Sequence, residues 1–160
     1  MPRIATLLCV TLLLTCSGCN SPSPEATRTE VQQLVRDYVD ANNKPDVTAM
    51  MELVSRTDGV SMAINGSVAR GWDAIRTFND GATAAASGSF QMALGSIDVR
   101  PLGGSAALVV APVTLAIGGA NQDESVQRTG ALSMVLEKAD KGWKIVHQHM
   151  SLEPEQVEGD

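Results

Sequence analysis

The stretch GWKIVHQHMS, residues 142–151, decides how the C-terminal part of this chain is interpreted. It contains both histidines of the protein, His147 and His149, and one of its two tryptophans. Its loose alternation of apolar and polar residues predicts a half-buried β-strand. Because side chains alternate across a strand, His147 and His149 share one face, and Gln148 and Met150 share the other. The question is whether the two histidines form a site or lie on the surface of a sheet.

Three segments before this stretch also read as strands, and turn residues separate them. They span residues 90–100, 106–117 and 125–138. Residues 106–117 form a nearly continuous apolar run, which predicts a strand buried on both faces. Pro112 inside this run requires a bulge or an edge position, because proline has no N–H to donate. Together with residues 143–152, these segments predict an antiparallel meander of four strands.

Apolar residues recur at helical spacing in three segments of the N-terminal half. These segments are residues 31–39, 47–54 and 72–82. Pro45 ends the first helix, and Asp46 is placed to cap the second. Residues 60–64 predict a short strand before the third helix. The predicted fold class is therefore α+β, with three N-terminal helices packed on one face of a curved antiparallel sheet.

The first nineteen residues, MPRIATLLCVTLLLTCSGC, have a basic start, an apolar run and small residues, which is the layout of a secretory signal. The run is shorter than the ~20 residues that a transmembrane helix needs. Ser17-Gly18-Cys19 resembles a bacterial lipobox, although Cys16 stands where that motif usually has leucine. We therefore expect residues 1–18 to be a signal peptide and Cys19 to be lipidated. The alternatives are acylation of Cys16 and an ordinary signal without a lipid.

The composition agrees with one exported domain. All 3 cysteines lie in the first nineteen residues, so the rest of the chain offers neither a disulfide nor a thiol nucleophile. Residues 19–27 predict a lipidated tether, residues 28–152 a single domain and residues 153–160 an acidic tail. A formal net charge of −6 argues against nucleic-acid binding and against an electrostatic grip on anionic lipid. We expect membrane contact only through the lipid, on the periplasmic side of the outer membrane.

Three motifs of the chain resemble one known superfamily. They are RDYVDANNKPDVTAMMELV at residues 36–54, GWDAIRTF at residues 71–78 and the closing GWKIVHQHMS. With the element order, they resemble the nuclear transport factor 2-like (NTF2-like), cystatin-like roll, and within it the SnoaL-like branch. The closing strand is also similar to that of the association domain of calmodulin-dependent kinases. The resemblance covers about residues 27–152 and implies a cone around a pocket. Because this fold carries enzymes, binding modules and assembly domains, function has to be argued from the pocket.

The resemblance assigns the inner face of the closing strand to this pocket. Matching positions give an apolar, methionine-rich lining with a phenol and an amide as its polar groups. The candidate ligand-binding residues are Tyr38, Met62, Ile64, Trp72, Met134, Val146, Gln148 and Met150. Such a lining suits a small, mostly apolar ligand, although methionines also fill cores that bind nothing.

The same alternation places four residues on the convex face, through which relatives dimerise. These interface candidates are Trp143, Ile145, His147 and His149. We therefore expect a homodimer with its histidines at the interface. A His-x-His metal site would need a further ligand, and the chain has no third histidine. A histidine base in the pocket would require the opposite strand parity. We expect no metal and no cofactor.

The sequence shows no complete catalytic set. Steroid isomerases of this fold combine a tyrosine on the first helix and a protonated carboxyl with a carboxylate base on the first strand. Tyr38 matches the tyrosine, but residues 60–64 contain no acid, and residues 129–131 lack the carboxyl. Arg128 is placed to reach the pocket rim. A binding module is the leading hypothesis. The alternatives are an isomerase, dehydratase or hydrolase that uses Tyr38 and Gln148, and a non-enzymatic assembly domain.

Overall fold

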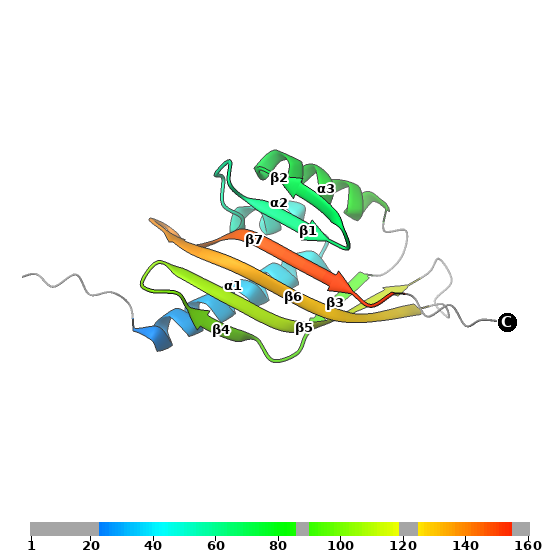
Figure 1. The fold of residues 1–160 in the computed structure, drawn as a ribbon. Coiled ribbons are helices and arrows are strands. Elements are labelled where there is room, and N and C mark those ends of the chain that lie inside the picture. The colour runs from blue at the N-terminus through cyan, green and yellow to red at the C-terminus, as the bar shows by residue number, and fades with distance from the viewer. Residues whose placement is uncertain (1–22, 86–89, 119–124, 155–160) are drawn as a thin grey trace, which may run out of the picture.

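The computed structural model describes residues 23–85, 90–118 and 125–154. The predicted signal peptide, residues 1–18, and Cys19 lie outside the described residues. Three helices pack against one face of a seven-stranded sheet, and α1 runs behind the long strands (Figure 1). The predicted α+β class and the three-helix roll are confirmed.

The first helix begins earlier than predicted. The helices are α1 (Pro24–Asn43), α2 (Val47–Leu53) and α3 (Trp72–Ala85). The hydroxyl of Ser23 accepts a hydrogen bond from the Ala26 amide at 3.2 Å, and Pro24 occupies the first helical position, where its missing N–H costs nothing. Thr27 is 1% exposed. Residues 24–27 therefore belong to α1 and not to the predicted tether, whose residues 19–22 lie outside the described part of the chain.

The sheet contains more strands than the sequence suggested. They are β1 (Ser61–Ile64), β2 (Ser67–Arg70), β3 (Phe90–Leu94), β4 (Asp98–Pro101), β5 (Ala106–Gly118), β6 (Ser125–Ala139) and β7 (Gly142–Leu152). Their order is β2-β1-β7-β6-β5-β3, with β4 also paired to β5. The meander from β3 to β7 is antiparallel as predicted, but β1 runs parallel to β7, so the sheet is mixed.

Pro112 lies where the first predicted long strand breaks in two. The expected strand over residues 90–100 is β3 followed by β4, and both pair with β5. The carbonyl of Pro112 accepts from the Gly95 amide at 2.9 Å, so this edge of Pro112 faces the gap between β3 and β4. No paired residue in this gap needs a hydrogen bond from the N–H that proline lacks. The prediction that the strand pairing is irregular at Pro112 is therefore confirmed.

The outer face of β5 is not buried. Alternate residues of β5 face the helices and are buried, whereas Val110 on the opposite face is 45% exposed and Pro112 is also exposed. The prediction that this strand is buried on both faces is therefore wrong. An apolar run cannot by itself distinguish a doubly covered strand from one whose second apolar face is left open.

A β-bulge in β7 reverses the parity that a regular strand would have. Leu136 of β6 pairs with Ile145, but the preceding Val135 pairs with His147, so Val146 is an extra residue without a partner. On the C-terminal side of the bulge, Gln148 faces the helices. On the N-terminal side, Ile145 faces them as well.

Gly130 of β6 lies directly against the backbone of β7. A Cβ atom at this position would collide with the carbonyl oxygen of Ser151 and lie 2.9 Å from the Cα atom of Leu152. Both are backbone atoms of the paired strand, so no rotamer change can relieve the contact. Glycine is therefore required at this position of β6.

We expect Gly130→Ala to lower the free energy of unfolding by at least about 1–3 kcal/mol, the usual cost of overpacking. Gly81→Ala is the matched control, because this helical glycine has no heavy atom within 4 Å of an added Cβ. The control should raise stability by roughly 0.5–1 kcal/mol. Urea unfolding followed by circular dichroism measures both variants. Wild-type stability in Gly130→Ala would show that the two strands are further apart.

Candidate functional site

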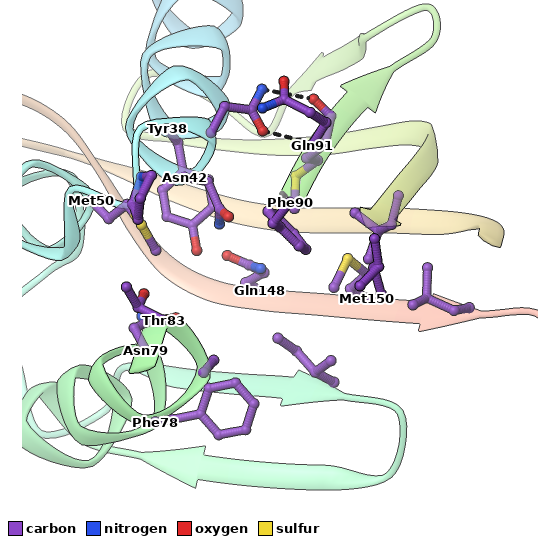
Figure 2. Close-up of a pocket in the computed structure, with 18 of the residues that line it drawn as sticks. Tyr38, Asn42, Met50, Phe78, Asn79, Thr83, Phe90, Gln91, Gln148 and Met150 are labelled. Carbon is purple, nitrogen blue, oxygen red and sulfur yellow. Dashed lines mark hydrogen bonds between the residues drawn. The ribbon is translucent and has the colours of Figure 1, made fainter. Parts of the chain in front are cut away.

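A mainly apolar cavity lies between the helices and the inner face of the sheet. Its volume is about 520 Å³, within the range of ligand pockets. Figure 2 shows side chains from α1, α3, β3 and β7 converging on it. The described lining residues are Tyr38, Asn42, Asn43, Pro45, Met50, Ile64, Asn65, Phe78, Asn79, Ala82, Thr83, Phe90, Gln91, Met92, Leu115, Ile117, Arg128, Gln148, Met150 and Leu152.

Polar side chains from three elements meet at the inner end of this cavity. Tyr38 and Asn42 come from successive turns of α1, Asn79 and Thr83 from successive turns of α3, and Gln148 from β7 (Figure 2). Asn79 and Gln148 are only 7% and 4% exposed. Uncharged amides and hydroxyls both donate and accept, so this cluster suits a ligand hydroxyl or carbonyl.

The phenol of Tyr38 stays protonated across the physiological range. The residue is 2% exposed, and burial raises the pKa of Tyr38 to about 12, because a phenolate would lose its hydration. Hydrogen bonding by Gln148 opposes this rise in pKa. The group can therefore donate a hydrogen bond to a ligand oxygen, but it is not a base near neutral pH.

The outer part of the cavity is apolar with one charged group at its rim. Phe78 of α3 and Phe90 of β3 lie on opposite sides of β7, where Met150 forms part of the floor (Figure 2). Ile117 is 41% exposed and continues the apolar wall. Arg128 is the only charged side chain among the described lining residues, and its reach to the rim agrees with its place on β6.

The cavity brings together only half of the ligand-binding candidates. Tyr38, Ile64, Gln148 and Met150 line it. Met62 and Met134 face the same side of the sheet but are 3% and 0% exposed and belong to the closed core. Val146 is the bulge residue and lies outside the lining, so its predicted pocket position is wrong.

Trp72 also lies outside the cavity. Its indole N–H donates to the backbone carbonyl of Met51 at 3.2 Å. The guanidinium groups of Arg56 and Arg76 lie 4.3 and 5.7 Å from its ring centroid. Trp72 therefore holds the start of α3 against α2, and the two arginine side chains pack over its ring. Its predicted position in the pocket is wrong.

Several lining residues escaped the sequence interpretation because they are polar. Asn42 follows Tyr38 by four positions, and Asn79 and Thr83 follow Ile75 by four and eight. Each therefore continues the buried stripe of its helix. Polar residues on the buried face of a helix indicate a cavity, because a filled core would have apolar residues at these positions.

The two interface candidates before the bulge lie in the core. Trp143 and Ile145 are 5% and 2% exposed and face the helices, so their predicted place on the convex face is wrong. The indole N–H of Trp143 donates to the Glu30 carboxylate at 2.8 Å, and Lys138 Nζ contacts the same oxygen at 2.8 Å. These contacts tie the β6–β7 hairpin to α1.

The two histidines do lie on the outer face of the sheet. His147 Nδ1 is 2.8 Å from the Ser61 hydroxyl, and His149 is exposed beside it. Within the described part of the chain, no three His, Cys, Asp or Glu residues are grouped to hold a metal ion. No helix described by the structure is long and apolar enough to cross a membrane.

Comparisons with solved structures agree on the fold. An NTF2-like superfamily protein from Salmonella enterica serovar Typhimurium LT2 has a TM-score of 0.75 at 20% identity, covering 86% of this chain and 99% of its own. A candidate dehydratase of the NTF2-like family from Streptomyces avermitilis has a TM-score of 0.72 at 20% identity, covering 82% and 99%. A candidate scytalone dehydratase from Novosphingobium aromaticivorans has a TM-score of 0.72 at 13% identity, covering 81% and 86%.

The search of curated proteins finds no match. The family model described as the SnoaL-like domain matches residues 31–154, which contain α1 from Val31 onward, the other two helices, the sheet and the whole described lining of the cavity. The chain therefore belongs to the SnoaL-like family, with the NTF2-like, cystatin-like fold.

Proposed function

We propose that this protein binds a small, mostly apolar molecule in the cavity between its helices and its sheet. The observation that carries the proposal is the uncharged polar cluster at the inner end of an otherwise apolar cavity of about 520 Å³. Apolar walls supply most of the binding free energy, and a few convergent polar groups fix the orientation of the ligand. The described lining contains neither Asp, Glu, His nor Cys, which favours binding over acid–base or nucleophilic chemistry.

Native mass spectrometry of residues 20–160, purified without detergent, should show the protein with a discrete extra mass. Ala82→Phe should abolish this mass, because Ala82 lines the cavity and a phenyl ring there would occupy it. Ala85→Phe is the matched control, since Ala85 is an exposed residue one turn further along α3 and outside the lining. Loss of the mass in both variants, or in neither, would contradict binding in this cavity.

A dehydratase-type or isomerase-type enzyme is the second candidate. It is supported by the buried phenol of Tyr38 beside Gln148 and by the similarity of the fold to candidate dehydratases. A neutral phenol can stabilise negative charge that develops on a carbonyl oxygen. In such a mechanism the protonated Tyr38 is the electrophilic group, and a base from the substrate or solvent is still required.

Tyr38→Phe separates the two candidates. The molecule released from the purified protein is incubated with wild type and variant, and its conversion is followed by mass spectrometry. A binding module converts nothing in either form, whereas an enzyme loses about 100-fold or more of its turnover in the variant.

The control is alkaline unfolding. The contribution of Tyr38 to wild-type stability is present below pH 10 and is lost between pH 10 and about 12, and the variant lacks this loss.

We also propose that the protein is exported and held at the outer membrane by a lipid on Cys19. The sequence of residues 1–19 supports this localisation. In Figure 1, the start of α1 and the C-terminal end of β7 lie at opposite ends of the domain. Because Met150 and Leu152 at this end of β7 line the cavity, a tether at the N-terminus leaves the cavity accessible. The intact mass of the membrane-extracted chain tests the anchor: it should begin at Cys19 and carry acyl chains.

A homodimer through the outer face of the sheet is part of the same proposal. Leu108 and Val135 are paired neighbours on this face and half-buried, and Val110 is 45% exposed beside them. His147 and His149 continue the surface on β7. A flat apolar centre with polar surroundings is the usual composition of a homodimer interface.

Val110→Asp should convert a wild-type dimer to a monomer in sedimentation velocity, because a carboxylate would be buried without a partner. Leu102→Asp is the matched control. Leu102 is also 45% exposed, but it lies in the connection between β4 and β5. A monomeric wild-type protein, or dissociation of both variants alike, would rule out this interface.

A further inference from the structure

We infer that the cavity selects an elongated ligand with one anionic end group, of the carboxylate class, and that Arg128 binds this group at the mouth. The inference rests on the proposed binding function and specifies the chemistry of the ligand. It makes Arg128 the residue that determines specificity, while the polar cluster around Tyr38 receives the other end of the ligand.

Arg128 is held in place by the backbone of the chain. Its Nη2 and Nε donate to the carbonyl oxygen of Glu153 at 2.7 and 3.3 Å. A guanidinium has five N–H donors, so three remain for a ligand. Because the side chain is already ordered, a bound anion would not have to immobilise a free arginine.

The charge of Arg128 is not neutralised by a carboxylate within the described part of the chain. The carboxylate of Glu153 accepts a hydrogen bond from the Thr129 hydroxyl at 2.7 Å, and Thr129 is exposed on the opposite face of β6. The ion pairs found among the described residues join Arg28 to Glu25, Arg76 to Asp80 and Lys138 to Glu30. Arg128 therefore presents a positive charge to the cavity.

The walls around Arg128 strengthen its electrostatic effect. Leu115 is its direct partner on β5, and the neighbouring pair Ile117 and Val126 is 41% and 44% exposed at the mouth. Apolar walls of low dielectric focus the field of a single charge along a cleft. An anion that enters here displaces water from these walls and gains charge-assisted hydrogen bonds.

The spacing of the charged and neutral groups sets the length of the ligand. Met134, the β6 partner of Gln148, is separated from Arg128 by 134 − 128 = 6 residues of an extended strand. This corresponds to about 20 Å along the backbone, which the arginine side chain shortens. The ligand therefore has an anionic group, an apolar body and a hydroxyl or carbonyl group at the far end.

The test uses two probes that differ only in charge, ω-hydroxydecanoate and its primary amide, and measures binding by isothermal titration calorimetry. The wild-type protein should bind the carboxylate about tenfold or more tightly than the amide, and added salt should reduce the preference. Arg128→Gln should remove the preference and leave amide binding unchanged. Arg128→Lys should retain part of it, because lysine keeps the charge without the planar guanidinium fork.

Arg100→Gln is the matched control, because it removes the same charge from an exposed position on β4 outside the cavity lining. This variant should keep the full preference for the carboxylate. Equal binding of both probes by the wild-type protein would overturn the inference while supporting the cavity as a binding site. Binding of neither probe would overturn the inference. The proposed binding function would then be tested separately, by the native mass spectrometry described above. If Arg128→Gln and Arg100→Gln lost the preference for the carboxylate equally, the preference would come from the net charge of the protein and not from Arg128.

Discussion

The fold and the cavity both depend on the single extra residue in β7. Since Val146 has no partner on β6, Ile145 and Gln148 both face the helices although they are three positions apart, an odd offset that would put them on opposite faces of a regular strand. Before the bulge, Trp143 reaches Glu30 of α1 and anchors the hairpin to the helix. After it, Gln148 and Met150 form the floor of the cavity. A regular strand would have to turn one of these two groups outward, because side chains alternate strictly across a regular strand.

The chemistry of the site follows from its lack of charge at the inner end. Amides and a protonated phenol surround the deepest part of the cavity, and the high pKa of Tyr38 keeps that phenol neutral. Such groups orient a ligand at little electrostatic cost, because burying a neutral hydrogen-bonding group is much less unfavourable than burying an ion. The fold is shared with proteins that carry dehydratase descriptions, but fold alone does not transfer an activity. The described lining contains no carboxylate or imidazole side chain, and the proposal of a binding function rests on the neutral polar groups and apolar walls that are present.

Among the described lining residues, the one charged side chain is Arg128 at the mouth. The carbonyl of Glu153 holds Arg128 in place. The exposed apolar residues Ile117 of β5 and Val126 of β6 lie next to it. The two ends of the cavity differ chemically, because the inner end is neutral and the mouth is cationic. An asymmetric ligand would therefore enter in one orientation, with its polar ends recognised by different chemistry.

The sequence by itself determined the elements that local periodicity encodes. Helical stripes located α1, α2 and α3, the motif at Asp46 located a helix start, and alternation placed His147 and His149 on the same outer face. These features depend on neighbours within a few positions of the chain, where spacing alone decides which side chains share a face. The family resemblance, and not the spacing, assigned Tyr38 of α1 and Gln148 and Met150 of β7 to a pocket, and all three line the cavity.

Only the tertiary structure decided the remaining features. The bulge at Val146, the break between β3 and β4 and the parallel pairing of β1 with β7 are properties of strand pairs, so one strand read alone does not reveal them. For this reason Trp143 and Ile145 lie in the core and not on the convex face. Trp72 lies outside the cavity, where its indole N–H donates to the Met51 carbonyl of α2. The same holds for the cavity, since Asn79 and Arg128 are far apart in sequence and line one cavity only because a helix and a strand pack around it.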